Sequence, residues 1–121
     1  MAKKILIVED DSFLKGLAAQ KLAESDFSVE SAESAEKAIK MIDADIPDLV
    51  LLDVILPGDD GFVVLKKIRE NVKMTKTPVI IFSNMADPEN MKKAQDLGAT
   101  SYMVKSNFTL AELVEKVKSL L

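Results

Sequence analysis

The 121-residue sequence lacks cysteine and histidine, two residue types that carry much of protein chemistry. Without cysteine there are no disulfides and no thiolate metal ligands. Without histidine the chain has none of the commonest general bases and metal ligands, and no site for a phosphohistidine. Any chemistry must therefore run on carboxylates, hydroxyls and lysines.

Glycine and proline are also scarce, with four of each, and no apolar run approaches the length of a membrane span. The 16 basic and 20 acidic residues give a formal net charge of -4. This charge disfavours non-specific binding to nucleic acid or to an anionic membrane. The amino-terminal apolar run is too short for a signal peptide, so we expect a cytoplasmic protein. The length fits a single domain over residues 1–121.

Five short apolar runs alternate with segments of helical periodicity, and we predict the runs to be strands. The second run alternates apolar with polar residues, which is typical of an edge strand. Strands that alternate with helices through short loops predict an α/β fold, an open parallel sheet with helices on both faces. The flavodoxin-like order 2-1-3-4-5 is preferred to a Rossmann half, because no Gly-x-Gly-x-x-Gly follows the first strand. The predicted strands are Ile5–Val8, Phe27–Ser31, Leu49–Leu52, Pro78–Phe82 and Ser101–Val104.

Capping residues mark the predicted helix starts. Asp11 or Ser12 precedes the first helix, and Thr109 and Glu112 have the spacing of a capping box before the last. Apolar residues three and four positions apart define the face that each helix buries. The first helix is predicted to bury Leu14, Leu17, Ala18 and Leu22, and the last Leu110, Leu113, Val114, Val117 and Leu121. The other residues interpreted as caps or turns are Ser34, Asp59, Asp60 and Asp87.

Polar residues follow four of the predicted strands, at the point where each strand ends. Glu9 and Asp10 follow the first strand, Asp53 the third, Ser83 the fourth and Lys105 the fifth. In an open parallel sheet these strand ends share one edge, where ligands bind. Clustered carboxylates without histidine or cysteine suit a hard divalent cation, Mg²⁺ first and Mn²⁺ or Ca²⁺ next. Together with a lysine and a hydroxyl they predict a site that holds a phosphoryl group.

Asp53 is the candidate nucleophile at this edge. The chain has no P-loop and no glycine-rich phosphate cradle after any strand, which disfavours a small phosphorylated ligand. A carboxylate at the end of a buried strand can instead attack a phosphoryl donor and form an acyl phosphate. The metal ion and Lys105 would then neutralise the phosphoryl oxygens.

Four segments, taken together and in this order, carry a resemblance to a known family: residues 5–11, 47–61, 78–83 and 98–105. Over essentially its full length the chain resembles the receiver domain of a two-component response regulator. The resemblance implies a phosphoacceptor signalling protein that catalyses only its own phosphorylation and dephosphorylation. It implies a histidine kinase or histidine phosphotransferase as partner, and a switch of the surface formed by the fourth helix, fifth strand and fifth helix.

Site roles follow from the resemblance, residue by residue. Asp53 would accept the phosphoryl group. Asp10, Asp53 and the backbone carbonyl of Ile55 would bind Mg²⁺ directly, and Glu9 would act through water. The residues implied to contact or sense the phosphoryl group are Ser83, Asn84 (backbone amide), Lys105 and Tyr102, the aromatic whose rotamer follows Ser83.

Two positions depart from the family pattern. Ser106 follows Lys105 where a proline in a cis peptide is usual; a cis bond to serine costs about 3 kcal/mol, so we expect a trans bond. Asn84 replaces a small residue, and its larger side chain is expected to restrict donor access or the inward swing of Tyr102. One alternative is therefore a degenerate receiver that binds partners without phosphorylation. Another is a receiver excised from a larger regulator.

Two other classes fit part of the pattern. A phosphohydrolase with an aspartyl-phosphate intermediate usually has a second acid two residues after the nucleophile, where this chain has Ile55. A flavin-binding electron carrier of the same fold is disfavoured by the acidic first loop. Residues 99–101 lack the paired acids of the winged-helix transcription factors, so we expect a monomer or weak dimer. Neither Ile55 nor Met85 can hold a hydrolytic water by a hydrogen bond, which predicts slow self-dephosphorylation.

Overall fold

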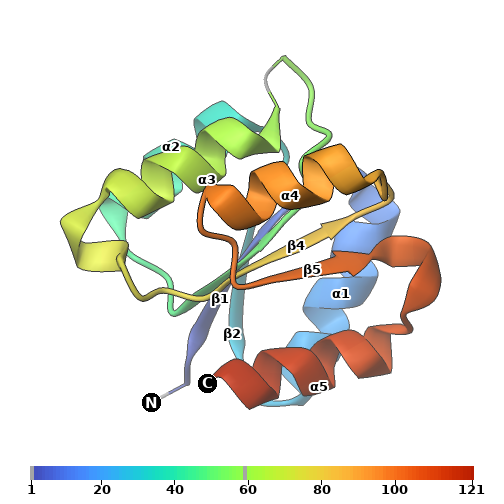
Figure 1. Cartoon of the computed structure of the whole chain (residues 1–121). Coiled ribbons are helices and arrows are strands. Elements are labelled where there is room, and N and C mark those ends of the chain that lie inside the picture. Colours follow the sequence, from blue (N-terminus) through green and yellow to red (C-terminus); the bar gives the residue numbers. More distant parts are fainter. Residues whose placement is uncertain (1, 59) are drawn as a thin grey trace.

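The structure, a computed structural model, describes residues 2–58 and 60–121 as a parallel five-stranded sheet between two helical layers (Figure 1). The strand order is β2-β1-β3-β4-β5, and every neighbouring pair is parallel. The predicted flavodoxin-like order is therefore confirmed. The strands are β1 (Lys4–Val8), β2 (Ser28–Ala32), β3 (Leu49–Leu52), β4 (Val79–Ser83) and β5 (Ser101–Val104).

Each strand is followed by a helix. The first four helices carry the chain from the carboxyl end of one strand back to the amino end of the next. No helix in the described part of the chain is long and apolar enough to cross a membrane. The α-helices are α1 (Ser12–Glu24), α2 (Ala35–Ala44), α3 (Gly61–Glu70), α4 (Pro88–Asp96) and α5 (Leu110–Leu120). Two short 3-10 helices are η1 (Val72–Met74) and η2 (Lys105–Asn107).

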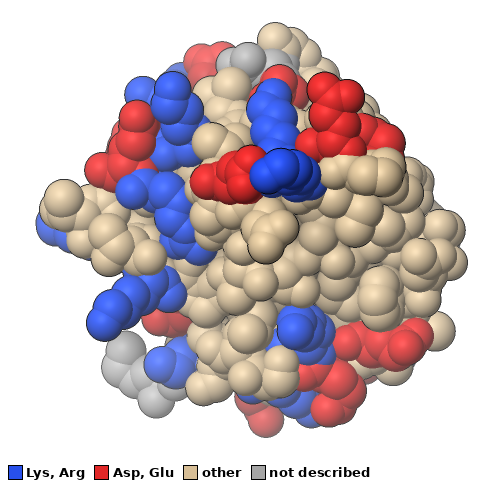
Figure 2. Space-filling model, in the orientation of Figure 1, with Lys and Arg blue, Asp and Glu red and all other residues tan. Residues whose placement is uncertain are grey.

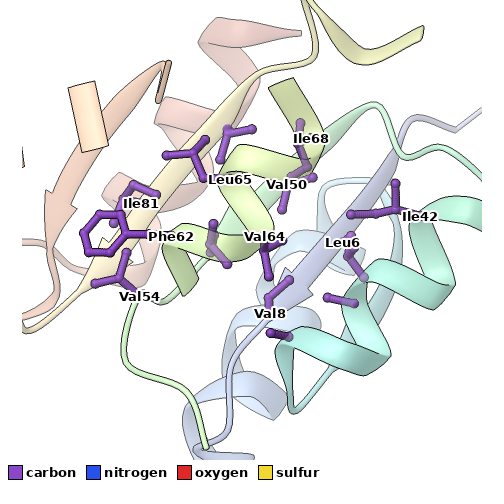
Figure 3. Close-up of a cluster of buried hydrophobic side chains, with 14 of the residues drawn as sticks. Leu6, Val8, Ile42, Val50, Val54, Phe62, Val64, Leu65, Ile68 and Ile81 are labelled. Atoms are coloured by element: carbon purple, nitrogen blue, oxygen red, sulfur yellow. The ribbon is translucent and has the colours of Figure 1, made fainter. Parts of the chain in front are cut away.

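Two apolar clusters lie on the two faces of the sheet, because successive residues of a strand point to opposite faces. The cluster in Figure 3 packs α2, α3 and α4 against side chains such as Leu6, Val50 and Ile81. The other packs α1 and α5 against Ile7 and Leu51. β1, β3 and β4 are buried on both faces apart from the first residue of β1. This explains why they are continuous apolar runs.

The predicted strand bounds need small corrections. Strand β1 begins one residue earlier than predicted, at Lys4. Strands β2 and β4 begin one residue later than predicted, at Ser28 and Val79, and also end one residue later. The prediction that β2 is an edge strand is confirmed, and its residues alternate between exposed and partly buried until the buried Ala32.

The predicted caps are confirmed where the structure describes them. Asp11 is the N-cap of α1, because its Oδ1 accepts hydrogen bonds from the backbone amides of Phe13 and Leu14. Asp60 caps α3 in the same way, and Thr109 forms the expected capping box with Glu112. Caps of α2 and α4 are Ser34 and Asp87, while Asp59 lies outside the described residues.

Two residues predicted to be buried are exposed. Leu17 keeps 37% of its surface accessible, because α1 buries only the narrow row of Ala18 and Leu22, and Leu17 lies about 100° away from it. Leu121 is 41% exposed because α5 ends at Leu120. The predicted apolar faces of α1 and α5 were wrong at these two positions.

Candidate phosphoacceptor site

The strand register brings the predicted polar residues to the carboxyl edge of the sheet. Val8 lies opposite Leu52, so the next residues, Glu9 and Asp53, leave β1 and β3 side by side. Their backbone amides are fixed by hydrogen bonds to the carbonyl oxygens of Ala32 and Val8, each at 2.9 Å. On the other side, Val104 lies opposite Ser83, the last residue of β4, and Lys105 follows it.

Lys105 bridges the two buried carboxylates of this edge. Its Nζ lies 2.6 Å from Asp53 Oδ2 and also hydrogen-bonds to Glu9 Oε1. The three side chains are 12%, 6% and 5% exposed for Lys105, Asp53 and Glu9. The cluster thus consists of two carboxylates and one ammonium group that are shielded from water, and its residues follow three different strands.

The second oxygen of each carboxylate is held by a backbone amide. Asp53 Oδ1 accepts from the amide of Ile55 at 2.9 Å, and Glu9 Oε2 accepts from the amide of Asp11 at 3.2 Å. In the described residues no buried side-chain nitrogen or oxygen lacks a hydrogen-bond partner. Both carboxylates are therefore fixed in orientation by their own loops and by Lys105.

Burial and charge act in opposite directions on the groups of this cluster. Burial raises the pKa of Glu9 above its ordinary value, and the charge of Asp53 adds to this rise, while Lys105 opposes it. Burial also acts to lower the pKa of Lys105, but its hydrogen bonds to Asp53 and Glu9 outweigh burial and raise it. Lys105 is accordingly an ammonium at neutral pH.

The acidic residues of this edge could hold a metal ion. One carboxylate oxygen from each of Glu9, Asp10 and Asp53 lies within 4.8 Å of the others, and the Asp10 side chain is exposed. All three donors are hard oxygens, and an exposed side leaves room for water ligands. This donor set fits Mg²⁺ or Mn²⁺, which prefer carboxylates and retain several waters.

The β4–α4 loop beside this cluster joins Ser83 to Tyr102. Ser83 is fully buried, and its Oγ accepts a hydrogen bond from the amide of Met85 at 3.3 Å. The Tyr102 hydroxyl reaches across from β5 and donates to the Met85 carbonyl. Burial raises the pKa of Tyr102, with smaller contributions from the charges of Asp87 and Asp53. Serine and tyrosine are thus linked through the backbone of one residue.

At the two positions that depart from the family pattern, the structure gives clear outcomes. Asn84 is exposed, and Tyr102 reaches the loop beside it. The Lys105–Ser106 peptide is trans, as predicted. Lys105 reaches both Glu9 and Asp53 from this trans loop, so the missing proline does not displace its ammonium group.

Gly61, whose role the sequence did not reveal, packs against the backbone of Asp53 and Val54. A Cβ atom at this position would lie 2.3 Å from the carbonyl oxygen of Asp53 and 2.6 Å from the Cα of Val54. The Gly61 amide donates to the Val54 carbonyl at 2.8 Å. The start of α3 therefore lies directly against the backbone of Asp53, a contact that only glycine permits. A glycine at the first position of a helix is the one signal for it in the sequence.

Comparison with known families agrees with this geometry. The model of the response regulator receiver domain matches residues 5–118. The chain belongs to this family. It is a receiver of two-component signalling with an acidic pocket of Glu9, Asp10 and Asp53. Receivers are signalling phosphoacceptors rather than enzymes, and the family implies a cognate histidine kinase.

Individual relatives cover nearly the whole chain. It is 29% identical over 121 residues to the phosphate regulon transcriptional regulatory protein PhoB of Klebsiella pneumoniae, covering 100% of this chain and 52% of PhoB. The chain thus spans about half the length of that relative. The CheY-like receiver domain protein of Methanospirillum hungatei JF-1 has a TM-score of 0.92 at 28% identity, covering 98% of this chain and 93% of that chain. The phosphorylated cyanobacterial phytochrome response regulator RcpA has a TM-score of 0.86 at 29% identity, covering 99% and 91%.

Proposed function

We propose that Asp53 accepts a phosphoryl group from the phosphohistidine of a partner histidine kinase or histidine phosphotransferase. The observation that supports this most directly is the position of Lys105 Nζ, 2.6 Å from Asp53 Oδ2, beside a cluster of three carboxylates. An ammonium group and a cation site flank the same carboxylate. This is the arrangement that an in-line phosphoryl transfer to Asp53 needs.

The metal site is part of the proposal. Asp10, Asp53 and the backbone carbonyl of Ile55 would hold Mg²⁺, or Mn²⁺ in its place, and Glu9 would act through a bound water. When bound, the ion supplies positive charge to the oxygens of the phosphoryl group. Without it, the acidic pocket would repel the donor, because Glu9, Asp10 and Asp53 outnumber the single charge of Lys105.

The transfer balances without an additional reactant. A carboxylate oxygen of Asp53 forms the new bond to phosphorus as the phosphorus–nitrogen bond of the donor breaks. The histidine nitrogen keeps the bonding electron pair and takes a proton from solvent. Lys105 holds its own proton throughout, because its pKa is raised, and so contributes charge rather than acid catalysis.

Ser83 and Tyr102 would report the phosphorylated state. In this proposal the Ser83 hydroxyl, the Asn84 amide and Lys105 contact the phosphoryl oxygens. The Ser83 hydroxyl would donate to a phosphoryl oxygen, and rotation of its side chain toward that oxygen would weaken the hydrogen bond that Oγ accepts from the Met85 amide. Met85 is the residue whose carbonyl accepts from the Tyr102 hydroxyl. Phosphorylation would thereby change the surface of α4, β5 and α5 and its affinity for a downstream protein, or the phosphoryl group would pass onward in a phosphorelay.

Residues 1–121 act as one receiver in this proposal. The phosphorylated relative RcpA, 29% identical over nearly the whole chain, supports a phosphoacceptor rather than a degenerate receiver. The similarity to PhoB extends over only half of that regulator, so no transcriptional output is carried over to this chain.

The experiment that tests the proposal is phosphorylation by a small acyl-phosphate donor, read by the intact mass of the protein. We expect one phosphate adduct in the presence of Mg²⁺ and none after chelation of the metal. Asp53→Asn should abolish the adduct. Asp60→Asn changes an exposed cap at the same edge and should retain it. An adduct that persists in Asp53→Asn, or its absence from the wild-type protein, would overturn the proposal.

A further inference from the structure

The opposite, amino edge of the sheet carries positive charge that has no internal partner. Between Lys66 and Lys76 the only acid is Glu70, against five basic residues. Among the described residues none of the four lysines of this segment forms an ion pair, whereas Lys37 and Lys40 each pair with the glutamate four residues earlier. In Figure 2 blue side chains run down the left side of the molecule, over the end of α3 and the segment after it. The basic residues are Lys66, Lys67, Arg69, Lys73 and Lys76.

The backbone of this segment is held in a defined conformation. Met74 is fully buried and anchors η1 in the core. Arg69 Nη1 donates to the Met74 carbonyl at 2.9 Å, and Asn71 Oδ1 accepts from the Lys73 amide at the same distance. Val72, between these contacts, is 85% exposed, more than any other large hydrophobic residue that the structure describes. Val72 therefore presents one apolar side chain from a fixed backbone, directly beside Lys73.

A hollow of about 460 Å³ is lined by residues that include Lys73, the residue after Val72. Lys3, Lys73 and Lys76 contribute to its lining, and Asp48 is its only acidic side chain. The Asp48 carboxylate already accepts a hydrogen bond from the Lys4 amide at 2.7 Å. Three lysines therefore line the hollow together with one carboxylate that is already hydrogen-bonded, and this excess of positive charge favours anions.

We propose that the basic edge, defined as Lys3, Val72, Lys73 and Lys76, docks an acidic segment of a partner protein. Carboxylates of the partner would enter the hollow, and one apolar side chain would pack on Val72. Nucleic acid fits less well, because no aromatic side chain lines the hollow for stacking on bases and the chain carries a net charge of -4. A membrane fits less well, because Val72 and Leu121, the exposed apolar residues at this surface, offer little apolar area to insert.

This surface is separate from the proposed phosphoacceptor site. Lys3 precedes β1 and Lys76 precedes β4, while Glu9 and Asp53 follow the ends of their strands. Strands of four or five residues separate the two edges by about 15 Å. The inference goes beyond the proposed function, and each can fail without the other.

The test is binding of a short fluorescent peptide of glutamates with interspersed leucines to the whole chain, followed by anisotropy. Lys73→Glu/Lys76→Glu should weaken binding about tenfold or more. Lys37→Glu/Lys40→Glu changes the net charge by the same amount on α2 and should leave binding within about twofold. Val72→Ser should weaken binding without a change of charge, and Phe13→Ser, at another exposed apolar residue, should not.

Two further probes distinguish the other occupants: a single-stranded oligonucleotide and a vesicle that contains phosphatidylserine. Selective loss of peptide binding in Lys73→Glu/Lys76→Glu supports the proposal. Equal loss in both double variants shows non-specific charge attraction and overturns it. Absence of peptide binding, or binding of the oligonucleotide or vesicle at this edge in preference to the peptide, also overturns it. Phosphorylation of Asp53 should be unchanged in both double variants.

Discussion

The two edges of the same sheet use charge in opposite ways. At the carboxyl edge Lys105 is buried between Glu9 and Asp53, and each carboxylate oxygen of that pair has a hydrogen-bond donor. At the amino edge Lys73 and Lys76 are exposed and form no ion pair with any described residue. Charges in the first group are fixed in place around one carboxylate, that of Asp53, the proposed phosphoacceptor. Charges in the second are available to another molecule.

The largest expected difference between the two edges is in stability. Lys105→Met leaves two buried carboxylates without their cation, so we expect the free energy of unfolding to fall by about 3 kcal/mol. Lys76→Met at the exposed edge should change it by less than about 0.5 kcal/mol. Urea denaturation of the two variants without metal measures both values. Similar losses in the two variants would show that the cluster around Lys105 does not differ energetically from the open surface.

Tight packing beneath Asp53 gives the next effect. Gly61→Ala places a methyl group against the Asp53 carbonyl, so we expect a loss of about 2 kcal/mol as the start of α3 moves away. Gly16→Ala, in α1, meets nothing within 4 Å and should stabilise by roughly 0.5–1 kcal/mol. Thermal and urea unfolding of the pair provide the measurement. A stabilising Gly61→Ala would mean that the backbone there is not constrained.

The apolar surroundings of Asp53 should control the lifetime of the phosphoryl group proposed to form there. Ile55 is 51% exposed and Met85 is partly buried, and neither can orient a hydrolytic water. We expect Ile55→Asn or Met85→Glu to accelerate loss of phosphate by about tenfold, equivalent to about 1.4 kcal/mol. The decay of the mass adduct after removal of the donor measures this rate. Unchanged decay in both variants would eliminate the shielding explanation.

The smallest effect concerns Tyr102, which reaches the carboxyl edge from β5. It is the chain's one tyrosine and there is no tryptophan, so an ultraviolet titration follows this hydroxyl alone. Burial raises its pKa, so the midpoint should lie above about 10, the ordinary value. Asp87→Asn should lower the midpoint. Because the Tyr102 pKa is raised in the wild-type protein, its folded state binds more protons than the unfolded state just above about pH 10. The free energy of unfolding should therefore fall as pH rises there. A midpoint at the ordinary value would place the hydroxyl in water.

Much of this architecture was predictable from the sequence. Apolar runs such as Leu49–Leu52 predicted strands that are buried on both faces. The acids directly after such runs predicted where the site lies. The errors have local causes. Leu17 satisfied a helical spacing but lies off the narrow contact of α1, and helix periodicity does not tell which apolar residues meet a neighbour.

The contacts between distant segments were not predictable from the sequence. The guanidinium of Arg69 bonds to the carbonyls of Met74 and Gly98, and nothing distinguishes this arginine in the sequence from the lysines beside it. The ion pair between Lys105 and Glu9 was also not predicted. Strand ends specify which residues meet at the edge of a sheet, but not which of them bond.

Glu9, Asp53 and Lys105 directly follow the first, third and fifth strands, and this has a consequence for folding kinetics. The two acids meet as soon as β1 and β3 pair, whereas their cation arrives with the strand that is last in the sequence. A partly assembled sheet therefore carries an uncompensated repulsion that the complete sheet relieves. This penalty disfavours partly folded forms and makes docking of β5 a condition for a stable sheet, so the proposed phosphoryl transfer and the cooperativity of folding depend on the same lysine.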